Sequence, residues 1–126
     1  MSVDDHEAIR QLTARYNLAF DERDVDSWLA CFTPDASVEF VDTGRVIRGH
    51  DELRQVIAST DNTGRHTTTD FIIDVDGDRA TQRCHLVELG LDRGKAVVRR
   101  YGRYEDHLQR DERGVWRFAS RRLRYG

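Results

Sequence analysis

Three side chains capable of acid–base chemistry occur where they could share one site. Tyr16 and Asp21 lie at the end of the first amphipathic segment, and His66 opens a later segment rich in β-formers. A histidine can take a proton from carbon or water and hand it to a leaving oxygen, and a carboxylate partner fixes its tautomer. A tyrosine hydroxyl can hold a substrate oxygen and stabilise developing negative charge. These residue types could together form a proton-transfer site.

Each of the three residues also has an ordinary structural explanation. Asp21 can belong to a solvated Asp-Glu-Arg-Asp corner at residues 21–24, and His66 can be a strand-edge histidine. Tyr16 lies on an apolar stripe, where core packing is the commoner role of such a residue. Five residues along a helix are about 140° apart, so Tyr16 and Asp21 share a face only if the helix breaks at or before Asp21.

The N-terminal half predicts three helices that would position these groups. Apolar residues at offsets of three and four run from residue 4 to about residue 20. Asp24 can cap a second helix whose apolar stripe runs to Phe32 and stops at Thr33-Pro34, because proline disfavours helix in the residue before it. A third helix is expected to begin at His50 or Asp51 and to end in a polar loop at residues 59–64.

The rest of the chain predicts antiparallel strands. Residues 37–42 alternate polar and apolar side chains, residues 45–48 can pair with them, and Asp76-Gly77-Asp78 is a strong hairpin signal. Longer strands are expected at 65–75, 79–91, 96–109 and from 115 onward. Helices followed by a β-meander indicate an α+β fold. We expect a cone-shaped, strongly curved, mostly antiparallel sheet, with the three N-terminal helices enclosing a pocket on its concave side.

Four further residues are expected to line this pocket: Phe20, Trp28, Phe40 and His85. His85 alternates with Cys84 along its strand, so the outer face is an equally open position for it. The sequence contains no metal-ligand cluster and no Gly-rich phosphate loop, so we expect neither a metal nor a cofactor. Residues 74–78 resemble the start of a calcium loop but lack the later glutamate, which favours a hairpin turn.

Composition limits the class of protein. At 126 residues the chain is expected to form one domain, 1–126. Its net charge of −3 argues against nucleic acid or an anionic membrane as a partner, and the C-terminal arginines at 117, 121, 122 and 124 alternate with apolar residues as in a strand. No apolar run is long enough for a membrane span. Cys31 and Cys84 are isolated, as is typical of buried thiols in a reducing cytoplasm.

The order of these features is similar to the SnoaL-like branch of the nuclear-transport-factor-2-like (NTF2-like) superfamily. The pieces that match are Tyr16, Asp21, Asp24 and Trp28, the run Phe32-Thr33-Pro34-Asp35-Ala36, Arg65-His66, Asp76-Gly77-Asp78-Arg79-Ala80, and Gly114-Val115-Trp116-Arg117-Phe118. They cover nearly the whole chain in order. The resemblance implies the cone-shaped fold and a homodimer paired through the outer sheet face. It does not imply one activity, because this fold hosts dehydratases, isomerases, cyclases and hydrolases.

Within that branch the motifs most resemble dehydratases of the bile-acid and scytalone type and a related dehydrochlorinase. Those enzymes pair an aspartate at the end of the first helix with a histidine that opens a central strand, and Asp21 and His66 match these positions. Tyr16 matches the tyrosine five residues before the aspartate in the bile-acid type. The scytalone-type tyrosine pair is replaced by Phe20 and Phe40, which favours a sterol-like or other hydrophobic substrate over a phenolic one.

The predicted function is therefore cofactor-independent acid–base catalysis on a hydrophobic small molecule by Asp21, His66 and Tyr16. The reaction would be that of a lyase (dehydratase) or an isomerase. The alternative is a non-catalytic domain that binds a hydrophobic ligand or serves as an accessory subunit, in which Asp21 and His66 need not meet. Arginine-mediated binding of an anionic partner is a third, less favoured reading.

Overall fold

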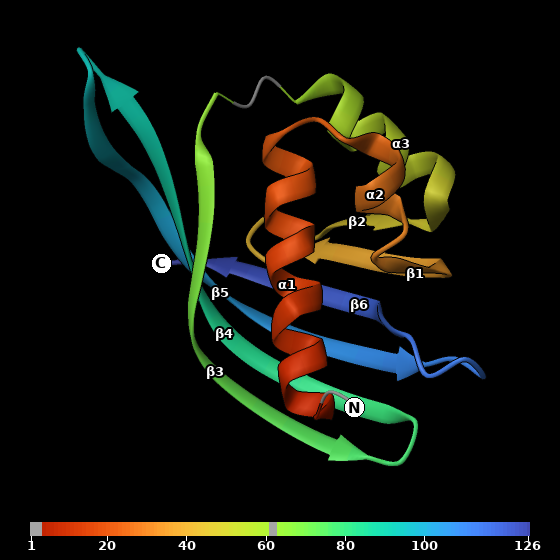
Figure 1. Ribbon diagram of the computed structural model, residues 1–126. Helices are drawn as coiled ribbons and strands as arrows, with labels where there is room; N and C mark the ends of the chain where they lie inside the picture. Colours follow the sequence, from red (N-terminus) through yellow and green to blue (C-terminus); the bar gives the residue numbers. More distant parts are fainter. Residues whose placement is uncertain (1–3, 61–62) are drawn as a thin grey trace.

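The computed structural model describes residues 4–60 and 63–126, which form three helices and one six-stranded sheet (Figure 1). The sheet curves around the long first helix, and the shorter helices cover the rest of its concave side. In chain order the elements are α1 (Asp5–Asp21), α2 (Val25–Leu29), β1 (Phe32–Phe40), β2 (Arg45–Arg48), α3 (Gly49–Ser59), β3 (Arg65–Asp76), β4 (Arg79–Asp92), β5 (Lys95–Arg110) and β6 (Trp116–Tyr125).

The strand order is β2-β1-β6-β5-β4-β3. Consecutive strands of the β3–β6 meander pair antiparallel, as do β1 and β2, whereas β1 and β6 run parallel. The predicted α+β fold, with a strongly curved and mostly antiparallel sheet and three helices, is confirmed. No helix in residues 4–60 or 63–126 is long and apolar enough to cross a membrane.

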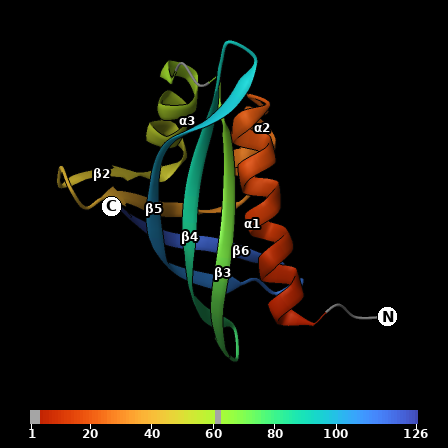
Figure 2. The ribbon, with the colours of Figure 1, turned by 90° about the vertical axis from the view of Figure 1, so that its left-hand side faces the viewer.

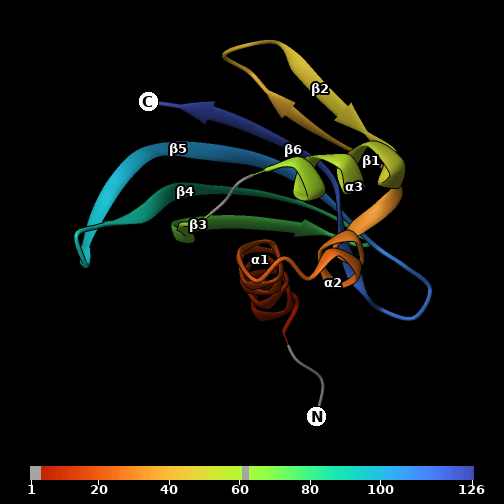
Figure 3. The same ribbon diagram turned by 90° about the horizontal axis from the view of Figure 1, so that it is seen from above.

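Helix α1 lies along β3, as two perpendicular views show (Figures 2 and 3). Asp4 caps its N-terminus by accepting a hydrogen bond from the His6 backbone, and Asp5 and Glu7 place negative charge in the first turn. Its buried face presents an apolar stripe with Ile9, Leu12 and Tyr16. The helix ends at Asp21, one residue later than expected.

Helix α2 is shorter than expected. Asp24 caps it as predicted, through a hydrogen bond from the Ser27 backbone, but the helix stops at Leu29. Phe32 already belongs to β1 and pairs with Phe118 of β6, so the predicted start of this strand at residue 37 was wrong. The register of the β1–β6 pair shifts between Phe32 and Ser37, and Pro34, which has no N–H to donate, lies within that shift.

Helix α3 starts at Gly49, where a φ of 80° suits a glycine. The polar loop expected at 59–64 includes residues 61 and 62, which lie outside the described part of the chain.

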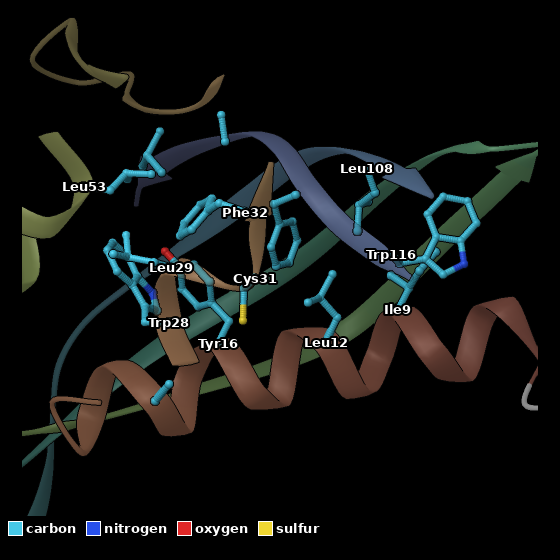
Figure 4. Close-up of a cluster of buried hydrophobic side chains, with 14 of the residues drawn as sticks. Ile9, Leu12, Tyr16, Trp28, Leu29, Cys31, Phe32, Leu53, Leu108 and Trp116 are labelled. Atoms are coloured by element: carbon cyan, nitrogen blue, oxygen red, sulfur yellow. The ribbon is translucent and has the colours of Figure 1, made fainter. Parts of the chain in front are cut away.

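Aromatic side chains from α1, α2, β1 and β6 form the centre of the core (Figure 4). The Tyr16 ring lies 5.6 Å from the Trp28 ring and 5.5 Å from the Phe32 ring, in tilted and edge-to-face geometry. Trp28 and Phe32 are almost fully buried. This cluster joins the helical layer to the middle of the sheet.

A buried ion pair lies beneath the aromatic cluster. Arg121 donates to Asp106 from Nε at 2.8 Å and from Nη2 at 3.1 Å, and both side chains are fully buried. Gln82 also donates to Asp106, at 3.0 Å. The two residues neutralise each other inside the protein, so Arg121 is not among the C-terminal arginines that could contact an anionic partner.

Candidate active site

Asp21 and His66 meet where the end of α1 faces the start of β3. His66 Nδ1 lies 2.6 Å from Asp21 Oδ1, and the His66 backbone N–H donates to Asp21 Oδ2 at 2.9 Å. The exposed fraction is 3 % for the Asp21 side chain and 15 % for His66. A carboxylate is an acceptor, so a proton on Nδ1 points at Asp21 and the neutral ring leaves Nε2 as its acceptor.

The chain turns sharply after Asp21, and this turn is tied to α3. Arg23 has a φ of 60° and its guanidinium donates to the carbonyl oxygens of Ile57, at 2.7 Å, and Thr60. The helix therefore breaks just after Asp21, not at or before it, so the condition under which Tyr16 and Asp21 would share one helix face is not met. The turn holds the carboxylate toward β3 rather than toward solvent.

Glu88 faces His66 from the neighbouring strand. The two residues are paired across β3 and β4, and His66 Nε2 lies 3.7 Å from Glu88 Oε1. Glu88 also accepts hydrogen bonds from Arg100 Nε at 2.6 Å and from the Tyr125 hydroxyl at 3.1 Å. The imidazole thus lies between two carboxylates, with the second held by β5 and β6.

The Arg100 guanidinium also stacks on Tyr125, 4.0 Å from the ring centre. Burial raises the pKa of the Tyr125 hydroxyl, and the negative charge of Glu88 raises it further. The phenol therefore remains a hydrogen-bond donor to Glu88 throughout the neutral range.

These groups border a cavity of about 310 Å³. Phe20, Trp28 and Phe40 line it, together with Tyr16 and His66. The rest of the wall combines apolar with polar and charged side chains. The apolar ones are Val38, Ile47, Leu53, Val56 and Leu123, and the polar or charged ones are Thr60, Glu88, Arg99, Arg100, Tyr104 and Tyr125. Such an arrangement suits a hydrophobic molecule with a few polar groups.

Tyr16 belongs to both the core and the cavity wall. Its ring packs among aromatic residues and is only 7 % exposed, and the Arg121 guanidinium lies 4.5 Å from the ring centre. Burial raises the pKa of Tyr16, while the positive charge of Arg121 opposes the rise. The hydroxyl is thus a neutral donor near a fixed positive charge.

His85 does not share this site. It faces the outer side of the sheet, where its side chain is 60 % exposed and its Nδ1 lies 2.9 Å from Asp70 Oδ2. Cys84 and Leu86, its neighbours along β4, take the inward positions and are buried. The expectation that His85 lines the pocket is corrected to its alternative, the outer face.

Sequence reasoning missed Glu88, Arg100 and Tyr125. No motif surrounds any of the three residues. Only the strand pairing brings them together, because Glu88 lies opposite both His66 and Arg100.

Comparison with known proteins places the chain in a family. A family model described as a SnoaL-like domain matches residues 1–122. A solved structure of Rv3472, a protein of unknown function from Mycobacterium tuberculosis, is 39 % identical, with 94 % of this chain and 70 % of that chain covered and a TM-score of 0.86. No functionally curated protein matches the chain.

More distant structures share the fold. An NTF2-like protein with a cystatin-like fold from Novosphingobium aromaticivorans is 24 % identical, with 96 % of this chain and 81 % of that chain covered and a TM-score of 0.87. A proposed scytalone dehydratase from the same bacterium is 21 % identical, with 96 % and 83 % covered and a TM-score of 0.80. The family match, the fold and these neighbours lead to one conclusion: the chain is a member of the SnoaL-like family and has the NTF2-like fold.

Proposed function

We propose that this protein is a cofactor-independent acid–base catalyst that acts on a hydrophobic small molecule as a dehydratase or an isomerase. The observation that carries the proposal is the 2.6 Å contact between His66 Nδ1 and Asp21 Oδ1 at the wall of the cavity. An imidazole oriented by a buried carboxylate, with its second nitrogen available, is the arrangement expected of a general base.

In the proposed reaction His66 Nε2 removes a proton from the carbon next to a carbonyl group. The C–H bond breaks, an N–H bond forms, and negative charge moves to the carbonyl oxygen. Asp21 and Glu88 both stabilise the imidazolium through their charge. Tyr16 donates a hydrogen bond to the charged oxygen.

The fate of the proton distinguishes the two reactions. If His66 returns the proton to a hydroxyl on the next carbon, the C–O bond breaks, a C=C bond forms and water leaves. If the proton returns to another carbon, the product is an isomer. The same residues serve both routes, so the substrate decides between them.

The test is exchange of the hydrogens next to the carbonyl of a panel of cyclic ketones and β-hydroxy ketones in D₂O, followed by NMR. We expect the wild-type protein to accelerate exchange, and His66→Gln to lose about a hundredfold or more of the rate. His85→Gln is the matched control, because His85 also pairs with an aspartate but lies on the outer face. Binding of the ketones without exchange would instead establish a ligand-binding or accessory domain.

We also propose that the protein forms a homodimer through the outer face of its sheet. Ile72 and Tyr101 are 52 % and 61 % exposed there, an unusual position for large apolar side chains near the middle of long strands. Analytical ultracentrifugation of the wild-type protein and of Tyr101→Glu tests this. A wild-type protein that sediments as a monomer would contradict it.

A further inference from the structure

Two consecutive arginines of β5, Arg99 and Arg100, both line the cavity. Neighbouring residues of a regular strand point to opposite faces of the sheet, so the regular alternation must be interrupted at one of these two arginines. The register of the β4–β5 pair explains this: Glu88 pairs with Arg100 and Leu89 pairs with Val98, which leaves Arg99 as the extra residue of a β-bulge. A bulge of this kind redirects a side chain, and here it brings a second guanidinium to the cavity.

Glycines make room for the redirected side chain. A β-carbon at Gly90 would collide with the Arg99 guanidinium, and one at Gly64 would lie 3.3 Å from Arg99 Nη1. Arg99 Nη2 donates to the Thr63 hydroxyl at 3.0 Å. The guanidinium is thus seated between β4 and the segment leading into β3, at the cavity wall.

The charges of the two arginines are balanced differently. Arg100 is neutralised by Glu88, whose Oε2 lies 2.6 Å from Arg100 Nε. Within residues 4–60 and 63–126, Arg99 has no carboxylate within ion-pair distance. Among these residues, no carboxylate in direct contact neutralises the Arg99 guanidinium at the cavity wall.

We propose that Arg99 is an anion subsite and that the ligand is an amphipathic carboxylate. Its apolar body would occupy the aromatic part of the cavity, and its carboxylate would bind the guanidinium of Arg99. A guanidinium fork matches the two oxygens of a carboxylate, and one guanidinium suits a monoanion. The inference rests on the proposed function for its assumption that the cavity is the substrate site.

The test compares two probes that differ in charge and little in shape: 2-naphthylacetate and its neutral amide, 2-naphthylacetamide. Calorimetry at low ionic strength measures the dissociation constant of each probe for the wild-type protein, Arg99→Gln, Arg99→Lys and Arg103→Gln. Arg103 is the matched control, because it lies on the same strand with its side chain exposed, outside the cavity lining.

We expect the wild-type protein to bind the carboxylate about fivefold more tightly than the amide, as for a partly exposed ion pair. Arg99→Gln should abolish this preference, Arg99→Lys should retain part of it, and Arg103→Gln should leave it unchanged. The preference should shrink as salt is added. Three results would each overturn the proposal. The wild-type protein could bind the two probes equally, it could bind neither probe, or Arg99→Gln could keep the preference unchanged.

The same experiment separates this inference from the catalytic proposal. His66→Gln should still prefer the carboxylate, because Arg99 is untouched. A protein that prefers the carboxylate but never accelerates proton exchange has the anion subsite without the catalysis. A protein that exchanges protons but binds both probes equally has the catalysis without the subsite.

Discussion

The Asp21 carboxylate holds His66 at two points, with one oxygen on the imidazole and the other on the backbone N–H of the same residue. The second contact fixes where the strand begins relative to the helix, and the first fixes the plane and the tautomer of the ring. One side chain therefore sets both the position and the orientation of the proposed base.

Replacing Asp21 with asparagine should lower the proton-exchange rate by about a hundredfold. The amide is nearly isosteric, so the fold should persist, but it supplies no negative charge to the imidazolium. Asp70→Asn is the control, since Asp70 forms a comparable contact with the exposed His85. Equal rates in the wild-type protein and Asp21→Asn would contradict the role given to the dyad.

Glu88→Gln should reduce the exchange rate by about tenfold. A carboxylate about 4 Å from an imidazolium contributes on the order of 1–2 kcal/mol in a partly solvated site, and that attraction would be lost. Glu88→Asp keeps the charge and should recover part of the rate, which a purely structural role would not predict. Glu105→Gln, on the exposed face, should have no effect on activity.

Asp106→Asn should destabilise the protein by about 3–5 kcal/mol, because it leaves the charge of Arg121 buried and unpaired. The double substitution Asp106→Leu with Arg121→Met removes both charges and should cost markedly less than the single substitution. Urea unfolding monitored by circular dichroism measures both. A double variant that is less stable than Asp106→Asn would show that the pair contributes net stability.

The two thiols should be unreactive in the folded protein. Burial raises the pKa of Cys31 from 9.0 to about 11 and that of Cys84 from 9.0 to about 12. Few thiolates are therefore present at pH 8, and a thiol reagent such as Ellman's reagent should react slowly until urea unfolds the chain. Rapid reaction of both thiols in the native protein would contradict this.

The raised pKa values of the two thiols also determine the direction in which stability changes with pH. Because the folded state holds these protons more tightly than the unfolded state, the associated stability is present below pH 9 and is lost as pH rises toward 11–12. Cys84→Ala should flatten this part of the stability curve in urea titrations at increasing pH.

Much of the fold was predictable because local patterns and long-range packing agree. The apolar stripe of α1, the alternation in the strands and the turn at Gly77 each indicate the element that forms. The second helix was overestimated, since pairing with Phe118 of β6 draws Phe32 into a strand. The two paired residues are far apart in the sequence, and their pairing outweighs the local helical pattern of apolar residues.

Half of the candidate site was predictable. Asp21 and His66 match positions of the SnoaL-like dehydratases, and the expected end of α1 and start of β3 lie within one residue of the observed ones. Glu88 was not predictable, because counting back from the hairpin pair Asp76 and Arg79 in a regular ladder places Leu89 opposite His66. A bulge between Thr69 and Ile72, where Asp70 has a φ of 59°, shifts the register and brings Glu88 there instead.

The alternation of side chains between the two faces of a strand also limits what the sequence can predict. Along β4 the inward positions are those of Cys84 and Leu86, and His85 between them must face outward. Nothing in the local sequence states which of the two faces is the concave one, so the choice for His85 depended on the tertiary structure.

The parallel pairing of β1 with β6 has a consequence for how the protein folds. It joins an early segment of the chain to the last strand of the meander. Residues from both parts line the cavity, for example Phe40 of β1 and His66 of the meander. Closing such a long loop is entropically costly and slow. The binding site should therefore appear only at the final cooperative step of folding, so that partly folded chains bind no ligand and a tight ligand stabilises only the complete structure.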